Sequence, residues 1–166
     1  MNFSRLLFRK PTLAFLLFIA QTSSLNAQLA GTYSVPGSFS TITAAIANLN
    51  TVGVSGGVTV NIATHYAETA VTGGYVLTVT GSSLNPIVFQ ANGSGAAPLI
   101  IAPQGTATPT SARQGGVWTL VGCDYITIKG LSILDTNSVN PATMEYGIGF
   151  FKQSTGNGCH YNTVEQ

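Results

Sequence analysis

The chain has 166 residues, of which 7% are charged, 45% are hydrophobic and 19 are glycine. This composition is too apolar for an intrinsically disordered segment, and low charge with abundant glycine favours an all-β scaffold with many tight turns. After residue 27, three basic residues face five acidic ones, giving a net charge of −2. No basic stripe remains to neutralise phosphates, which excludes nucleic acid as a partner.

The first 27 residues have the organisation of a secretory signal peptide. Three basic residues lie in the stretch 5–10, an apolar run follows at 13–20, and the segment ends on the small residue Ala27. A membrane span needs about 20 apolar residues, so this run is too short for an anchor. No later segment is apolar enough to span a membrane after removal of the signal. We therefore expect an exported protein that is secreted or held at the cell surface.

The next segment predicts a short strand and the single helix of the mature chain. An extended piece at 31–36 is followed by a helical pattern with Ser40 as the expected N-cap and Asn50 and Gly53 as the stop. Apolar residues at intervals of three and four form one stripe: Ile42, Ala45, Ile46 and Leu49. We expect residues 28–57 to cap the open end of a β-structure and to cover its backbone edges.

From residue 58 onward, the pattern has the period of two that is typical of β-strands. Val58, Val60 and Ile62 alternate with polar residues. Similar short runs lie at 77–79, 87–89, 99–101, 117–121, 125–128, 131–134 and 148–151. Glycine, asparagine and proline separate these runs, so the pattern fits a sandwich, a barrel or a solenoid.

An internal repeat favours the solenoid. Residues 123–130 align without gaps on residues 159–166, an offset of 36, and the cysteine, tyrosine and threonine are identical. Equivalent positions of successive coils lie above one another in a solenoid. The offset is long for one coil, so we interpret residues 135–141 as a loop inserted into it.

We therefore predict an all-β fold in which residues 58–166 form part of a right-handed parallel β-helix. The second copy of the repeat ends at Gln166 without a closing strand or helix. A β-helix that ended there would expose an unpaired coil, so we expect the sequence to be an amino-terminal fragment, incomplete at its carboxyl end.

Residues 39–46, 60–68 and 125–133 together resemble secreted pectin-lyase-like β-helix proteins. The first stretch looks like the helix at the amino-terminal end of that family. The second is similar to its first coil, a strand leading to Gly-x-Tyr-x-Glu, with His65 where glycine is usual. The third resembles its commonest coil. Similar openings occur in pectin methylesterases, in polysaccharide lyases and in large bacterial surface proteins of the type IX secretion route.

The acidic and basic residues form no cluster in the sequence. Enzymes of this fold that cleave polysaccharides use clustered carboxylates, often with Arg or Lys, whereas the five acids here are scattered. Asp124 and its repeat counterpart His160 would share one outward-facing stack, where a general base or a weak ligand pair is conceivable. Solvated corner residues are the commoner outcome, since no third group joins them. We predict no catalytic, cofactor-binding or metal-ligating residue and no cofactor.

The Tyr-x-Glu pair in residues 60–68 is interpreted as structural. We expect Tyr66 to pack, Glu68 to form hydrogen bonds at a corner and His65 to be a turn residue. No metal-ligand spacing surrounds His65.

The only cysteines are Cys123 and Cys159, at equivalent positions of the repeat. Exported proteins tend to oxidise paired thiols. Coils that rise by ~4.8 Å would bring the two Cα atoms near the ~5–6 Å that a disulfide needs. Small cysteines also stack unpaired inside β-helices, so a disulfide and a buried stack of free thiols both remain open.

Two functions fit these features. A non-catalytic surface protein, active in adhesion or carbohydrate binding, agrees with the low charge and with outer positions rich in Thr, Ser and Asn. Its partner would be a polysaccharide or another cell-surface glycan, stacked on Tyr and Trp exposed along a flat β face. The alternative is a carbohydrate-active enzyme, pectin lyase-like or pectin esterase-like, whose catalytic coils lie beyond residue 166.

Overall fold

The computed structural model describes residues 27–103, 113, 115–136 and 145–166. The expected signal peptide, apart from its last residue, and most of the expected loop at 135–141 lie outside these residues. Within them the chain forms one helix and eleven strands: β1 (Leu29–Val35), α1 (Ile42–Val52), β2 (Val54–Ala63), β3 (Ala67–Thr69), β4 (Tyr75–Leu77), β5 (Ile87–Asn92), β6 (Leu99–Ile101), β7 (Gly116–Val121), β8 (Ile126–Lys129), β9 (Ser132–Leu134), β10 (Tyr146–Phe151) and β11 (Thr163–Glu165).

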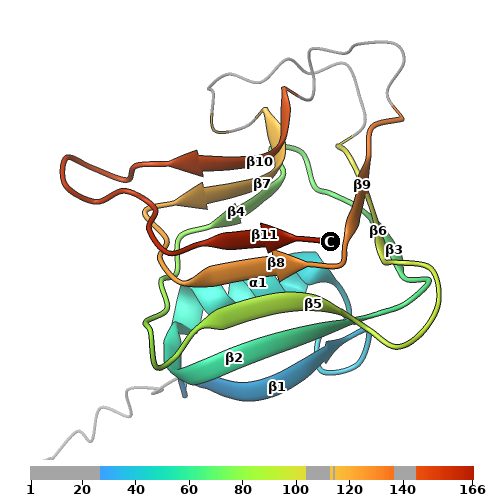
Figure 1. The fold of residues 1–166 in the computed structure, drawn as a ribbon, viewed down its shortest axis with the longest axis horizontal. Coiled ribbons are helices and arrows are strands. Elements are labelled where there is room, and N and C mark those ends of the chain that lie inside the picture. Colours follow the sequence, from blue (N-terminus) through green and yellow to red (C-terminus); the bar gives the residue numbers. More distant parts are fainter. Residues whose placement is uncertain (1–26, 104–112, 114, 137–144) are drawn as a thin grey trace, which may run out of the picture.

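The strands form three sheets in which every pairing is parallel (Figure 1). Sheet A has the order β1-β2-β5-β8-β11, sheet B the order β3-β6-β9 and sheet C the order β4-β7-β10. From β2 onward the chain visits sheets A, B and C in the same order in each circuit, and β11 returns to sheet A. The prediction of a mainly β chain is therefore confirmed, and each predicted strand run overlaps a strand of these sheets, whereas β3 was not predicted.

Alternation along each strand separates the core from the surface. In sheet A, Val60, Phe89 and Ile128 are neighbours in register and all are buried. The intervening residues Thr59 and Thr127 are only partly buried and lie on the other face. Inward rows of this kind from the three sheets make one apolar core. The rows end in exposed apolar residues such as Val164, because no described strand lies beyond β11.

The tryptophan belongs to this core and not to the surface. Trp118 is 0% exposed and lies between Tyr75 and Ile148 in the inward row of sheet C. Its ring makes edge-to-face contacts with Tyr75 and Phe89, at centroid distances of 5.0 and 5.1 Å. The expectation of an exposed tryptophan was therefore wrong. Trp118 has a paired strand on either side, and the side chains of those strands exclude water from its ring.

The apolar stripe of α1 is confirmed, since Ile42, Ala45, Ile46 and Leu49 are all buried. The expected N-cap was wrong. Thr41, not Ser40, accepts a hydrogen bond from the Ala44 N–H at 3.0 Å. Gly53 ends the helix with φ of +71° and donates its N–H to the Leu49 carbonyl.

Asn50 was expected to stop the helix but lies inside it and ties α1 to β4. Its side-chain amide donates to the Val76 carbonyl at 2.7 Å and accepts from the Thr78 N–H at 2.9 Å. These are the bonds that a neighbouring strand would make. The amide therefore satisfies backbone groups at the edge of sheet C that α1 covers.

Glu68 on β3 holds the other end of α1. Its carboxylate accepts hydrogen bonds from the N–H groups of Ile42 and Thr43, at 2.7 and 3.1 Å, and from Thr43 Oγ1 at 2.7 Å. The Tyr66 hydroxyl donates to the same carboxylate at 2.6 Å. With Thr41, Glu68 satisfies the donors that a helix leaves free in its first turn, and its charge complements the helix dipole. The hydrogen-bonding role expected for Glu68 is confirmed.

This network sets the ionisation of its members. Burial opposes ionisation of Glu68, but the bonds donated by Tyr66, Thr43 and Ile42 outweigh burial, so the pKa of this carboxyl lies below its ordinary value. Burial and the adjacent Glu68 raise the pKa of Tyr66, which therefore stays a donor. Tyr66 also packs against the core, as expected, and His65 lies in a turn with φ of +65°.

We predict that Glu68→Gln lowers the free energy of unfolding at pH 7 by about 1–3 kcal/mol, the cost of losing hydrogen bonds to a charged acceptor. The amide would place an NH₂ group against backbone donors. Because the native pKa is depressed, the contribution of Glu68 is complete above its unfolded pKa of about 4.3 and is lost as pH falls through the native value. Urea unfolding at pH 7 and pH 3 measures both effects.

The exposed Glu165 gives a matched control, and Glu165→Gln is expected to leave unfolding unchanged. Equal stability of Glu68→Gln and wild type at pH 7 would refute the capping role.

Candidate functional site

The repeated motif forms one corner of the fold, at the start of β8 and β11. Thr127 pairs with Thr163 and Ile128 with Val164, so the predicted offset of 36 residues is the register of the two strands. One residue before β8, the ring of Tyr125 stacks on that of Tyr161, with centroids 4.7 Å apart and planes inclined by 16°. The repeat therefore produces a stacked pair of aromatic rings.

Both tyrosines have left-handed backbone conformations, with φ of 55° for Tyr125 and 56° for Tyr161. Such a conformation costs a residue other than glycine about 1–3 kcal/mol and needs support from its surroundings. Asn162 supplies support, since its amide donates to the Cys123 carbonyl and accepts from the Ile126 N–H, both at 2.8 Å. The corner thus turns sharply at both tyrosines; Tyr125 is partly buried and Tyr161 is 74% exposed.

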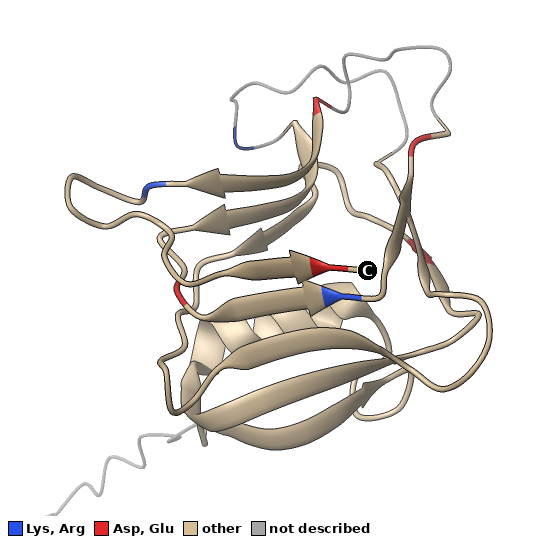
Figure 2. Ribbon diagram, in the orientation of Figure 1, with Lys and Arg blue, Asp and Glu red and all other residues tan. Residues whose placement is uncertain are grey.

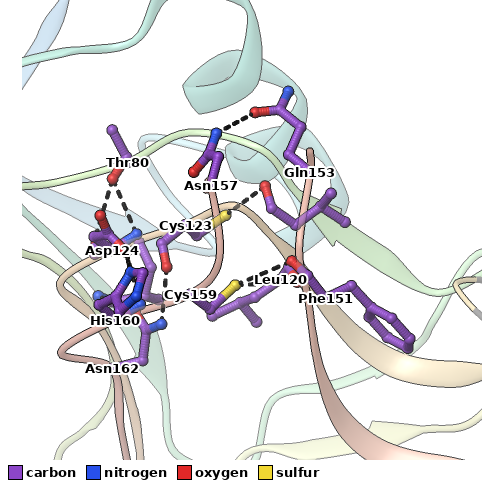
Figure 3. Close-up of polar contacts among 12 residues, drawn as sticks. Thr80, Leu120, Cys123, Asp124, Phe151, Gln153, Asn157, Cys159, His160 and Asn162 are labelled. Atoms are coloured by element: carbon purple, nitrogen blue, oxygen red, sulfur yellow. Dashed lines mark hydrogen bonds and ion pairs between the residues drawn. The ribbon is translucent and has the colours of Figure 1, made fainter. Parts of the chain in front are cut away.

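Asp124 and His160 lie beside the tyrosines and contact each other, as the repeat predicted (Figure 3). Asp124 Oδ1 accepts the His160 N–H at 2.7 Å and lies 3.2 Å from His160 Nδ1. The Asp124 N–H donates to Thr80 Oγ1 at 2.9 Å. Thr80, Asp124 and His160, from three successive circuits of the chain, therefore form one column of contacting residues. The side chain of His160 is 62% exposed and that of Asp124 33%.

The chemistry available to this pair is limited. An aspartate that orients an imidazole is half of a nucleophilic triad, which needs a third group within hydrogen-bond reach of the free ring nitrogen. Among the described residues, the His160 ring contacts Asp124 and the Tyr161 ring, and no serine, threonine or cysteine is hydrogen-bonded to it. In the same part of the chain, no three His, Cys, Asp or Glu side chains gather as metal ligands. The corner therefore presents an aromatic surface with polar groups beside it.

The two cysteines lie behind this surface as free thiols. The Cys123 thiol donates to the Leu77 carbonyl at 3.0 Å, and the Cys159 thiol lies 3.4 Å from the Phe151 carbonyl (Figure 3). Burial raises the pKa of Cys123 to about 12. The structure thus contains the unbridged arrangement, one of the two alternatives that the sequence left open.

Other charged side chains are few and spread over the molecule (Figure 2). Lys129 and Glu165 are neighbours in register at the far end of β8 and β11. Sequence reasoning identified the Asp124–His160 column but not the tyrosine stack or the role of Asn162. The identity of Tyr125 and Tyr161 in the repeat was the available signal for the stack.

We predict that the two thiols react at different rates. The thiolate is the nucleophile, and Cys123 is buried with a raised pKa, whereas Cys159 is partly exposed. Iodoacetamide at pH 8 should therefore modify Cys159 first, and both cysteines only after unfolding in urea. Peptide mapping by mass spectrometry distinguishes the sites. Equal rates in the native protein contradict this, and resistance of both thiols in urea until reductant is added selects the disulfide.

None of the described helices is long and apolar enough to cross a membrane. Comparison of the chain with protein-family models finds no match. No curated protein and no solved structure matches the chain significantly either.

Proposed function

We propose that this chain is part of a secreted or cell-surface protein built on a right-handed parallel β-helix, which binds carbohydrate and does not cleave it. The fold proposal is supported by three parallel sheets visited in the same order in successive circuits. Handedness follows from the strong preference of parallel crossover connections for the right hand. The α1 helix would then cap the first circuit.

The observation that carries carbohydrate binding is the outer face of sheet A. Two rows of side chains run across its strands in register: Thr32, Thr59, Val88, Thr127 and Thr163 in one row, and Ser34, Asn61, Gln90, Lys129 and Glu165 in the other. Hydroxyl and amide groups each donate and accept hydrogen bonds, which matches the hydroxyl groups of sugars. The Gln90 amide already donates to Asn61 Oδ1 at 2.9 Å, so part of this face is ordered.

The distribution of charge supports binding over cleavage. Hydrolysis of a glycosidic bond needs two carboxyl groups about 5–10 Å apart at one place. In the described residues the Asp124 carboxylate is bonded to His160, and that of Glu68 is bonded to α1. Both carboxylates are therefore engaged in holding the fold.

The test is affinity electrophoresis of the purified chain in gels that contain soluble polysaccharides. The panel comprises hydroxyethylcellulose, galactomannan, xyloglucan and polygalacturonate, with serum albumin as the non-binding control. We expect retardation by at least one polysaccharide and no release of reducing ends or unsaturated products from it. Retardation by none overturns carbohydrate binding, and release of products overturns the non-catalytic part of the proposal.

A further inference from the structure

We propose that Asn92 is a site of spontaneous modification, at which water converts the side-chain amide through a cyclic imide to aspartate and isoaspartate. Asn92 is the last residue of β5 and is followed by Gly93. Strands of sheet A lie on both sides of β5, with β2 on one side and β8 on the other. The site therefore belongs to the interior of the stack of circuits, and it is independent of the proposed carbohydrate binding.

The reaction needs a backbone nitrogen that can reach the asparagine side chain. The Gly93 nitrogen loses its proton to hydroxide and attacks Cγ of Asn92. The new N–Cγ bond closes the imide, Nδ2 takes a proton from water, and ammonia leaves. Water then opens the ring, at Cγ to give aspartate or at the main-chain carbonyl carbon to give isoaspartate. Glycine favours ring closure because it has no Cβ that hinders its nitrogen.

The surroundings of Asn92 leave this attack unobstructed. Asn92 and residues 93–97 are exposed, and within the described ranges neither the Asn92 side-chain amide nor the Gly93 N–H is hydrogen-bonded. The ladder between β2 and β5 ends at the pair Ala63–Asn92. Beyond it the Thr64 N–H donates to the Asn92 carbonyl at 3.3 Å, longer than is usual. Rotation about the Asn92 Cα–C bond, which brings the Gly93 nitrogen toward Cγ, therefore disturbs one long hydrogen bond.

A second Asn-Gly dipeptide, Asn157-Gly158, is held in place by its own turn. The Asn157 side-chain amide donates to Gln153 Oε1 at 2.8 Å (Figure 3). Its N–H donates to the Ser154 carbonyl at 3.2 Å, and its carbonyl accepts the Gln153 N–H at 2.8 Å. All three bonds lie within residues 153–157. Because ring closure must reorient both the side chain and the carbonyl, the same dipeptide is protected here and unprotected at Asn92.

Modification of Asn92 changes the charge and the main chain at the end of β5. Along this strand Asn92 has the same parity as Val88 and Gln90, so its side chain belongs to the outer face of sheet A. Either product adds a carboxylate to that face. Isoaspartate also lengthens the main chain by one carbon between β5 and β6, at the corner that the Thr64 N–H joins to the Asn92 carbonyl.

The test incubates the purified chain at pH 8 in water labelled with heavy oxygen, which marks each new carboxyl group, and maps the peptides by mass spectrometry. In the folded chain we expect Asn92 to be converted at least about tenfold faster than Asn157, because a factor of ten corresponds to about 1.4 kcal/mol of protection by hydrogen bonds. Methylation by an isoaspartyl methyltransferase distinguishes isoaspartate from aspartate. In urea the two asparagines should react at similar rates.

Two matched variants complete the experiment. Asn92→Gln should remove most of the isoaspartate, because glutamine must close a larger ring, whereas Asn157→Gln should leave the yield unchanged. Circular dichroism establishes that both variants are folded. Equal rates at the two sites in the folded chain, or an intact Asn92 in the folded chain that reacts in urea, would overturn the proposal. A preference for Asn92 that persists in urea would also overturn it, since the fold would then not be its cause.

Discussion

The register of the parallel strands is the constraint on which the rest of the structure depends. Because β8 and β11 pair with Thr127 opposite Thr163, residues 127–129 lie directly beside residues 163–165, their equivalents in the repeated motif. The tyrosine stack and the Asp124–His160 contact follow from this single alignment. A slip by one residue would exchange the two faces of the strand, so the apolar inward row would point to solvent and the polar outward row into the core. Burial of the inward rows therefore maintains the surface chemistry of the corner.

The first circuit depends on polar side chains that bridge segments far apart in sequence. Glu68 and Asn50 join α1 to β3 and β4, whose outer edges have no strand partner among the described residues (Figure 1). Each side chain satisfies backbone groups that would otherwise be left without partners under the helix. The packing of α1 thus combines an apolar stripe directed to the core with two polar attachments at its ends. The helix is part of the same core as the sheets.

Patterns with a local cause were predictable from the sequence. The stripe of α1 and the strand alternation in β2 depend on the spacing of neighbouring residues, and the 36-residue offset depends on a repeated motif. Contacts set by long-range packing were not. The capping partner of Ile42 is Glu68, 26 residues later, and burial of Trp118 depends on the strands on either side of it. The strand β3 was missed because only three residues form it and they include no alternating apolar pair. For the candidate site, the repeat identified the column but not the left-handed backbone that presents Tyr161.

The most direct test of this account is the register between β8 and β11, measured by nuclear Overhauser effects in the isotopically labelled chain. Directly paired residues of parallel strands lie about 4.8 Å apart, so we expect contacts between the side chains of Thr127 and Thr163 and between those of Ile128 and Val164. Side-chain contacts of Thr127 with Val164 in place of Thr163, or no side-chain contacts between these strands, would contradict the register. The stacked corner, and the surface chemistry inferred from it, would then have to be abandoned.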